Sequence, residues 1–160
     1  MQKTRLSKLF KQFQALNIIF LSALLLSCAG SSSSPDIQCP QPRFTGQAPA
    51  TYLALLNPVA DQVDAIAAGK ALYQESADPA CRLCHGRKGD GMGPLASQFS
   101  VPPRNFACAA TIKGIPDGQL FWIIENGSPD TNMDGFKHLN EVQIWQLVSY
   151  IRQLGDTGGS

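Results

Sequence analysis

The clearest helical pattern in the chain lies near its C-terminus, where apolar residues recur at the spacing of one helix face. Asn140 is a suitable N-cap, Gln143 completes a capping box, and Leu139 with Ile144 can form a hydrophobic staple across it. Gly155 is expected to end this helix. The apolar face comprises Val142, Trp145, Val148, Tyr150, Ile151 and Leu154.

Two shorter helices are expected before it. Asn57 and Pro58 signal the start of the first, with Asp61 as an alternative cap, and it runs to Ser76 before Asp78 and Pro79. The second covers residues 118–126 between the cap Asp117 and the closing glycine Gly127.

Strand patterns are nearly absent, and residues 87–111 form a long stretch rich in Gly and Pro. The expected class is therefore all-α, with few helices and much loop. Three short helices bury little apolar surface, so a bulky apolar cofactor would complete the core.

The first 27 residues read as a bacterial export signal. Residues 1–14 contain basic side chains and no acidic ones. Residues 15–26 form an apolar stretch that is too short to span a bilayer, which takes about 20 residues. The following Leu25-Leu26-Ser27-Cys28 resembles a lipobox, which implies cleavage before Cys28 and lipidation of its thiol. A plain secretory signal that happens to contain a cysteine is the alternative.

This interpretation of the N-terminal residues determines the expected domain organisation and cellular location. Residues 28–56 would be a lipidated cysteine, a Ser-rich tether and a Pro-rich arm, residues 57–155 the folded domain, and residues 156–160 a flexible tail. The protein would be anchored to a bacterial membrane facing the periplasm, and Ala29 favours the outer membrane in enteric-type sorting.

The charge argues against a nucleic-acid partner. All the charged residues among the first 27 are basic, and the remaining chain has nine basic and twelve acidic residues. The net charge of this remainder is about −3, so it lacks the clustered positive charge that binds phosphate.

The chemistry-bearing motif is Cys81-Arg82-Leu83-Cys84-His85, the Cys-x-x-Cys-His pattern of covalent haem attachment. On one helical turn, residues three apart lie on the same side, so both thiols can form thioethers with the two vinyl groups of one porphyrin. His85 can then bind the iron. A zinc site, a dithiol redox pair and a structural disulfide are the alternatives.

The surrounding sequence resembles bacterial class I monohaem cytochromes c. The resemblance spans residues 61–155 and includes CRLCHGRKGDGMGPLASQFSVPPRNF from residue 81, LFWIIENG from residue 120 and TNMDGF from residue 131. It implies a cytochrome c fold with few helices around one covalently attached haem c. It also implies that the first and last helices cross, with Gly69, Tyr73 and Tyr150 at the crossing.

The resemblance implies Met133 as the second axial ligand, opposite His85, although Asp134 replaces the usual proline after it. Met92 and His138 are the other candidates, and an open iron site is a further alternative. A His–Met pair closes the iron to substrates and gives a relatively high potential.

Other residues are candidates for the haem environment or for a disulfide. The resemblance implies that the Pro94 carbonyl accepts the His85 Nδ1–H. Arg104 and Trp122 are candidate donors to a haem propionate. Cys39 and Cys108 are an even pair in an oxidising compartment, so a disulfide is expected, with two free thiols as the alternative.

The sequence therefore predicts a lipid-anchored monohaem c-type cytochrome that carries single electrons between redox proteins. It is expected to be an electron carrier and not an enzyme, with no small-molecule substrate. A dedicated haem subunit of a larger respiratory or dehydrogenase complex is the alternative, and a haem enzyme with a labile sixth ligand is a third.

Overall fold

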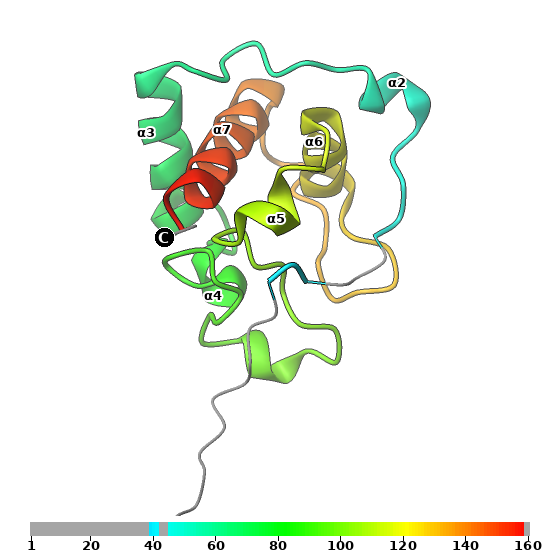
Figure 1. Cartoon of the computed structure of the whole chain (residues 1–160), viewed down its shortest axis with the longest axis vertical. Helices are drawn as coiled ribbons and strands as arrows, with labels where there is room; N and C mark the ends of the chain where they lie inside the picture. The colour runs from blue at the N-terminus through cyan, green and yellow to red at the C-terminus, as the bar shows by residue number, and fades with distance from the viewer. Residues whose placement is uncertain (1–38, 42–44, 159–160) are drawn as a thin grey trace, which may run out of the picture. The chain divides into compact units, whose positions relative to one another are not determined.

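In the computed structural model of the chain, the longest helix of the described residues, α7 (Glu141–Thr157), packs against α3 (Val63–Ala71) (Figure 1). The structure describes residues 39–41 and 45–158. The predicted export signal and the lipidation site Cys28 lie outside these residues. The described residues belong to one compact unit, Ile37–Ser160.

Helix α7 begins where the capping box predicts. The Asn140 side chain accepts from the backbone N–H of Gln143, and the Gln143 side chain accepts from the N–H of Asn140, both at 2.9 Å. The predicted end at Gly155 is wrong, because the helix continues to Thr157 and packs its buried Gly155 near the Phe106 carbonyl. Val142 is 58% exposed and so does not belong to the buried face.

Helix α3 begins later than predicted. Neither Asn57 nor Asp61 caps it, since its N-cap is Gln62 without a side-chain bond. The Asn57 amide instead donates to the Trp145 carbonyl and the Ser149 hydroxyl on α7. From Leu72 to Ser76 the chain continues as the π-helical turn η2, which ends at the predicted place.

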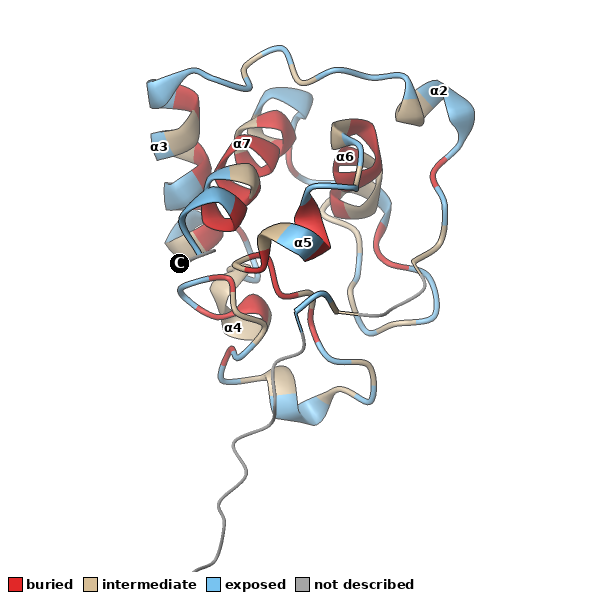
Figure 2. Ribbon diagram, viewed as in Figure 1, coloured by how far each residue is buried: buried red, intermediate tan, exposed pale blue. Residues whose placement is uncertain are grey.

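The crossing of the first and last helices is present. The rings of Tyr73 and Tyr150 meet edge to face with centroids 5.2 Å apart, and the backbone of α7 lies directly against Gly69. Figure 2 shows buried residues on each of α3, α6 and α7, and those of α6 and α7 contribute to one hydrophobic cluster.

The remaining helices are short. Besides α6 (Asp117–Asn126), they are α2 (Ala50–Leu53), α4 (Arg82–His85), the 3₁₀ turn η3 (Ala96–Gln98) and α5 (Ala109–Ile112). Helices α5 and α6 contact α7, α2 contacts α6, and α4 contacts η2 and η3. The single turn α2 lies where the sequence indicated an irregular arm.

Arg152 joins α5, α6 and α7. Its guanidinium donates to the Asp117 carboxylate at 2.7 Å, to the Ile112 carbonyl at 2.7 Å and to the Ile115 carbonyl. Asp117 is therefore occupied by an ion pair instead of capping α6, whose N-cap is Pro116.

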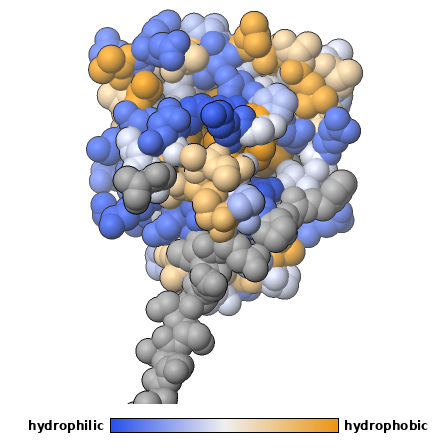
Figure 3. Space-filling view, viewed as in Figure 1, coloured by the Kyte–Doolittle hydropathy of each residue, from blue (hydrophilic) through white to orange (hydrophobic). Residues whose placement is uncertain are grey.

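The predicted all-α class is confirmed. The described residues contain no strand, and their only β pairing is an isolated bridge between Gly127 and Asp134. No helix among them is long and apolar enough to cross a bilayer. On the face seen in Figure 3, hydrophilic residues surround a smaller apolar area near the centre.

Candidate functional site

The two thiols and the imidazole of the Cys-x-x-Cys-His motif line one cavity of about 820 Å³. The motif forms the single helical turn α4, in which the N–H of His85 donates to the Cys81 carbonyl at 2.9 Å. Cys81 and Cys84 therefore lie on the same side of the turn, as their spacing predicts. No disulfide joins them.

A glycine-rich loop satisfies the C-terminal carbonyl groups of this turn. The N–H groups of Gly91, Gly93 and Leu95 donate to the carbonyls of His85, Cys84 and Leu83, at 2.9, 3.0 and 2.9 Å. These are acceptors that a short helix otherwise leaves without backbone partners. A Cβ on Gly93 would lie 2.3 Å from the Leu83 oxygen, so only glycine permits this approach.

His85 is oriented by the backbone of Arg104 and by the ring of Phe106. Its Nδ1 lies 3.0 Å from the Arg104 carbonyl oxygen, and its ring stacks on Phe106 with centroids 4.4 Å apart. A carbonyl only accepts, so Nδ1 carries the proton and Nε2 carries the lone pair that binds metals. This is the usual arrangement of a metal-binding histidine in proteins.

The prediction for Pro94 is corrected by this contact. Pro94 is exposed and does not line the cavity, and the acceptor for Nδ1 comes from residue 104. The segment around Arg104 reaches His85 because Gly91 has no side chain: a Cβ there would lie 2.8 Å from the Pro103 oxygen.

Met133 lines the same cavity from the loop of residues 128–138. Its carbonyl accepts from the Ser128 N–H at 2.9 Å, and the Phe136 N–H donates to the Ile124 carbonyl at 2.8 Å. Two glycines let the loop fold back against the end of α6. A Cβ on Gly127 would lie 2.7 Å from the Met133 oxygen, and one on Gly135 would lie 2.5 Å from the Glu125 oxygen.

The other candidate iron ligands differ in position. Met92 is 46% exposed and does not line the cavity. His138 is exposed but does line the cavity, with its ring 5.7 Å from that of Phe136. The geometry therefore keeps Met133 and His138 as candidates and removes Met92.

The two predicted propionate donors, Arg104 and Trp122, differ in whether they line the cavity. Arg104 lines the cavity, and its guanidinium donates to the Gln41 carbonyl at 3.5 Å and to the Thr45 hydroxyl. Trp122 does not line the cavity, which corrects its assignment to the haem environment. On α6 the lining residues are spaced as one helix face, to which Trp122 does not belong: Gln119, Leu120, Ile123 and Ile124.

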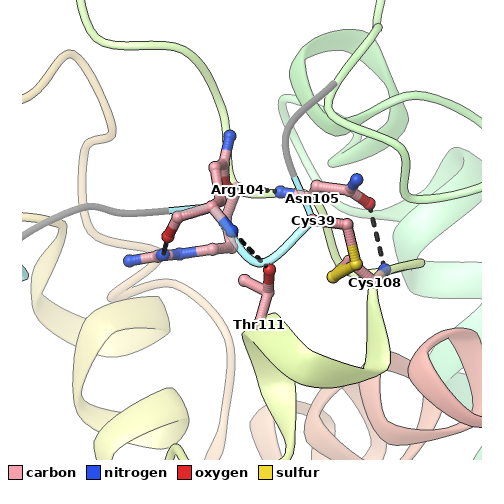
Figure 4. Close-up of a disulfide and its surroundings, with 6 residues drawn as sticks. Cys39, Arg104, Asn105, Cys108 and Thr111 are labelled. Carbon is pink, nitrogen blue, oxygen red and sulfur yellow. Dashed lines mark hydrogen bonds between the residues drawn. A yellow bond between two sulfur atoms is a disulfide. The ribbon is translucent and has the colours of Figure 1, made fainter. Parts of the chain in front are cut away.

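The described part of the arm, residues 39–41 and 45–56, contributes to one wall of the cavity. A disulfide joins Cys39 to Cys108 across 69 residues of sequence (Figure 4). Beside it, the N–H of Gln41 donates to the Thr111 hydroxyl at 3.0 Å. Further along, the N–H of Ala48 donates to the Gln119 side chain at 2.8 Å.

The two cysteines and the histidine of the motif fall short of the four ligands of a closed structural zinc site. Burial raises the pKa of Cys81 to about 12 and also raises the pKa of Cys84. Desolvation therefore disfavours the charged thiolate form of both side chains. No group of three His, Cys, Asp or Glu side chains that could bind a metal ion occurs in the described part of the chain.

The cavity fits a haem. Besides the two thiols and His85, its walls carry apolar side chains that a porphyrin would cover, including Leu95, Phe99, Val101, Leu120, Ile124 and Ile151. Cys81 and Cys84 could hold the group covalently, and His85 and Met133 could bind its iron.

Two contributors to the site were missed by sequence reasoning. The first is the Arg104 carbonyl, because a backbone acceptor leaves no signal in the residue type. The second is Gln41, whose side chain contacts a segment more than 60 residues away. Phe106, which stacks on His85, could have been found from the sequence, because it is an aromatic residue within the segment that carries the family resemblance.

Comparison with known proteins places these features in a family. Residues 64–151 match the family model described as cytochrome C oxidase, cbb3-type, subunit III. No curated protein matches the chain.

One similar solved structure is described as the Kuenenia stuttgartiensis reducing HAO-like protein complex Kustc0457/Kustc0458. The alignment has 28% identity and a TM-score of 0.55, and it covers 64% of this chain and 48% of that chain. The present chain thus aligns with about half of its neighbour's length.

Proposed function

Since the chain belongs to the cytochrome c oxidase, cbb3-type, subunit III family, and is therefore a c-type cytochrome with an electron-transfer domain, we propose that it is a membrane-anchored monohaem carrier of single electrons. The observation that carries this proposal is the shared cavity of Cys81, Cys84, His85 and Met133. One Cys-x-x-Cys-His motif in the sequence supports one haem.

The residues of α4 would hold the cofactor from one side. Cys81 and Cys84 would bind it covalently, and His85 would present Nε2 to the iron because its Nδ1 donates to the Arg104 carbonyl. A bound haem would supply one-electron chemistry at its iron. Arg104 would contribute positive charge at the cavity wall, where a propionate could accept from its guanidinium.

Met133 would be the second residue of the chain to bind the iron, and it would exclude other ligands from it. Its position in the cavity wall and the backbone bonds of residues 128–136 support this assignment. With both axial positions filled by the chain, electrons would enter and leave without substrate binding, which is the reason we propose a carrier and not an enzyme.

The membrane anchor rests on the sequence alone. The lipobox-like residues before Cys28 support lipidation, and the Ser-rich segment after it would act as a tether. The protein would then face the periplasm, in the outer membrane if the sorting rule for Ala29 applies. Cys28→Ser should release it from membranes, and retention of the variant would contradict the anchor.

A role as a dedicated haem subunit of a larger complex is the second candidate. It is favoured by the family description, which names a subunit, and by the similar solved structure, which is a protein complex. Purification in mild detergent from native membranes separates the two. A free carrier elutes alone, whereas a subunit elutes with stoichiometric partners.

The site is tested by mass and spectrum. Protein from cells that mature c-type cytochromes should carry the added mass of one haem, and Cys81→Ala with Cys84→Ala should carry none. The oxidised protein should show the weak near-infrared band of iron–thioether ligation. Met133→Ala should lose this band, whereas Met92→Ala and His138→Ala should keep it. Absence of the band from the wild-type protein would contradict Met133 as the ligand and favour His138.

A further inference from the structure

We propose that Gln41 is a positioning residue for the axial ligand His85, acting through the peptide groups on either side of Arg104. The inference rests on the proposed function, because it assigns His85 to the iron. It gives the arm a role in setting the reduction potential, in addition to covering the cavity.

The Gln41 side chain binds both neighbours of Arg104. Its Nε2 donates to the Pro103 carbonyl at 3.1 Å, and its Oε1 accepts from the Asn105 N–H at 3.0 Å. A primary amide carries both a donor and an acceptor, so one side chain can fix two successive peptide groups. Arg104 lies between these two contacts.

The Arg104 carbonyl between these contacts is the acceptor for His85. In an extended segment, the carbonyl of one residue points opposite to those of its neighbours. Gln41 therefore binds residues 103 and 105 on one side, and the carbonyl of Arg104 meets His85 Nδ1 at 3.0 Å on the other. Because Gln41 holds the peptide groups on both sides of Arg104, it also fixes the direction of the Arg104 carbonyl.

The arm is held in place independently of the Gln41 side chain. The disulfide of Cys39 with Cys108 lies two residues before it. The backbone of residue 41 donates to Thr111 and accepts from Arg104 (Figure 4). A side-chain substitution at Gln41 thus removes the contacts to residues 103 and 105 and leaves the arm attached.

The expected effect on the iron has a defined sign. A hydrogen bond from Nδ1 to a carbonyl makes the imidazole a stronger donor at Nε2. Stronger donation favours ferric iron and lowers the potential. Loosening the Arg104 carbonyl should weaken this bond and therefore raise the reduction potential.

The test compares Gln41→Met with Gln98→Met in the haem-loaded protein. Gln98 lies in η3, is exposed and does not line the cavity. Gln41→Met should raise the midpoint potential and speed the exchange of the His85 Nδ1 proton, followed by NMR in the ferrous protein, by about tenfold, which corresponds to one hydrogen bond. Gln98→Met should change neither quantity.

Gln41→Asn provides a second, milder variant if Gln41→Met does not fold. Its amide is too short to reach both peptides, so the same two changes should appear at smaller size. Unchanged potential and proton exchange in both folded variants would overturn the positioning role. A wild-type protein without covalent haem would instead overturn the proposed function, so the two failures are distinguishable.

Discussion

Gly69 of α3 lies directly against the Gln146 carbonyl of α7: an ideal Cβ on Gly69 would be 2.0 Å from that oxygen. The obstacle is backbone, and so it cannot move aside as a flexible side chain would. Helices α3 and α7 therefore approach as closely as they do only because residue 69 lacks a side chain.

Gly69→Ala is accordingly expected to destabilise the protein by about 3 kcal/mol, the upper end of the usual cost of overpacking. Urea unfolding of the haem-loaded protein measures this. Gly114→Ala is the matched control, since a Cβ at Gly114 would have no atom within 4 Å. Equal stability of the two variants would mean that the helices do not cross at this point.

Removing the disulfide should also destabilise the protein. Cys39 and Cys108 are separated by 69 residues, and closing a loop of that length constrains the unfolded chain by about 4 kcal/mol. The variant with Cys39→Ala and Cys108→Ala should show this loss in chemical denaturation. Thiol titration of the denatured wild-type protein provides the control, because two reactive thiols there would mean that no bridge forms.

Tyr73 gives the protein a defined response to alkaline pH. Burial raises the pKa of Tyr73 well above its ordinary value of 10.0. The folded state therefore holds this proton more tightly than the unfolded chain does. The resulting contribution to stability is complete below about pH 10 and is lost as the pH rises above it.

Tyr73→Phe removes this dependence together with a hydrogen bond to the Gly86 carbonyl, which is 2.9 Å long. The variant should be about 1 kcal/mol less stable near neutral pH, and its deficit should shrink between about pH 9 and pH 11. Free energies of unfolding at several pH values provide the measurement. A deficit that stays constant over this range contradicts the linkage.

The glycine-rich loop should matter for cofactor attachment. A Cβ on Gly93 would meet the backbone of Leu83 and Cys84, so Gly93→Ala should displace the turn that carries both thiols. We expect a lower yield of covalent haem per polypeptide, measured by intact mass. A full yield in Gly93→Ala would show that the turn tolerates this displacement.

The sequence predicts elements whose signals are local. The start of α7 follows from Asn140 and Gln143, which bind each other's backbone within one turn. Likewise, the spacing of Cys81 and Cys84 determines that both face one cavity. In these cases the partner lies within four residues, so residue type and spacing carry the information.

The predictions were wrong where a residue contacts a segment that is distant in the sequence. Asn57 resembles a cap but binds α7, and Asp117 resembles a cap but binds Arg152. Gly155 resembles a helix end but permits close packing near Phe106. The acceptor for His85 is a backbone carbonyl, which any residue type could have supplied.

The two sides of the cavity differ in how they are tied to the rest of the chain. The bridge from Cys39 to Cys108 closes a covalent ring that contains Cys81, Cys84 and His85, whereas Met133 lies outside that ring. Its loop is held by short-range backbone bonds. Local fluctuations should therefore open the protein on the methionine side first, and amides of residues 128–138 should exchange with solvent sooner than those of the ring.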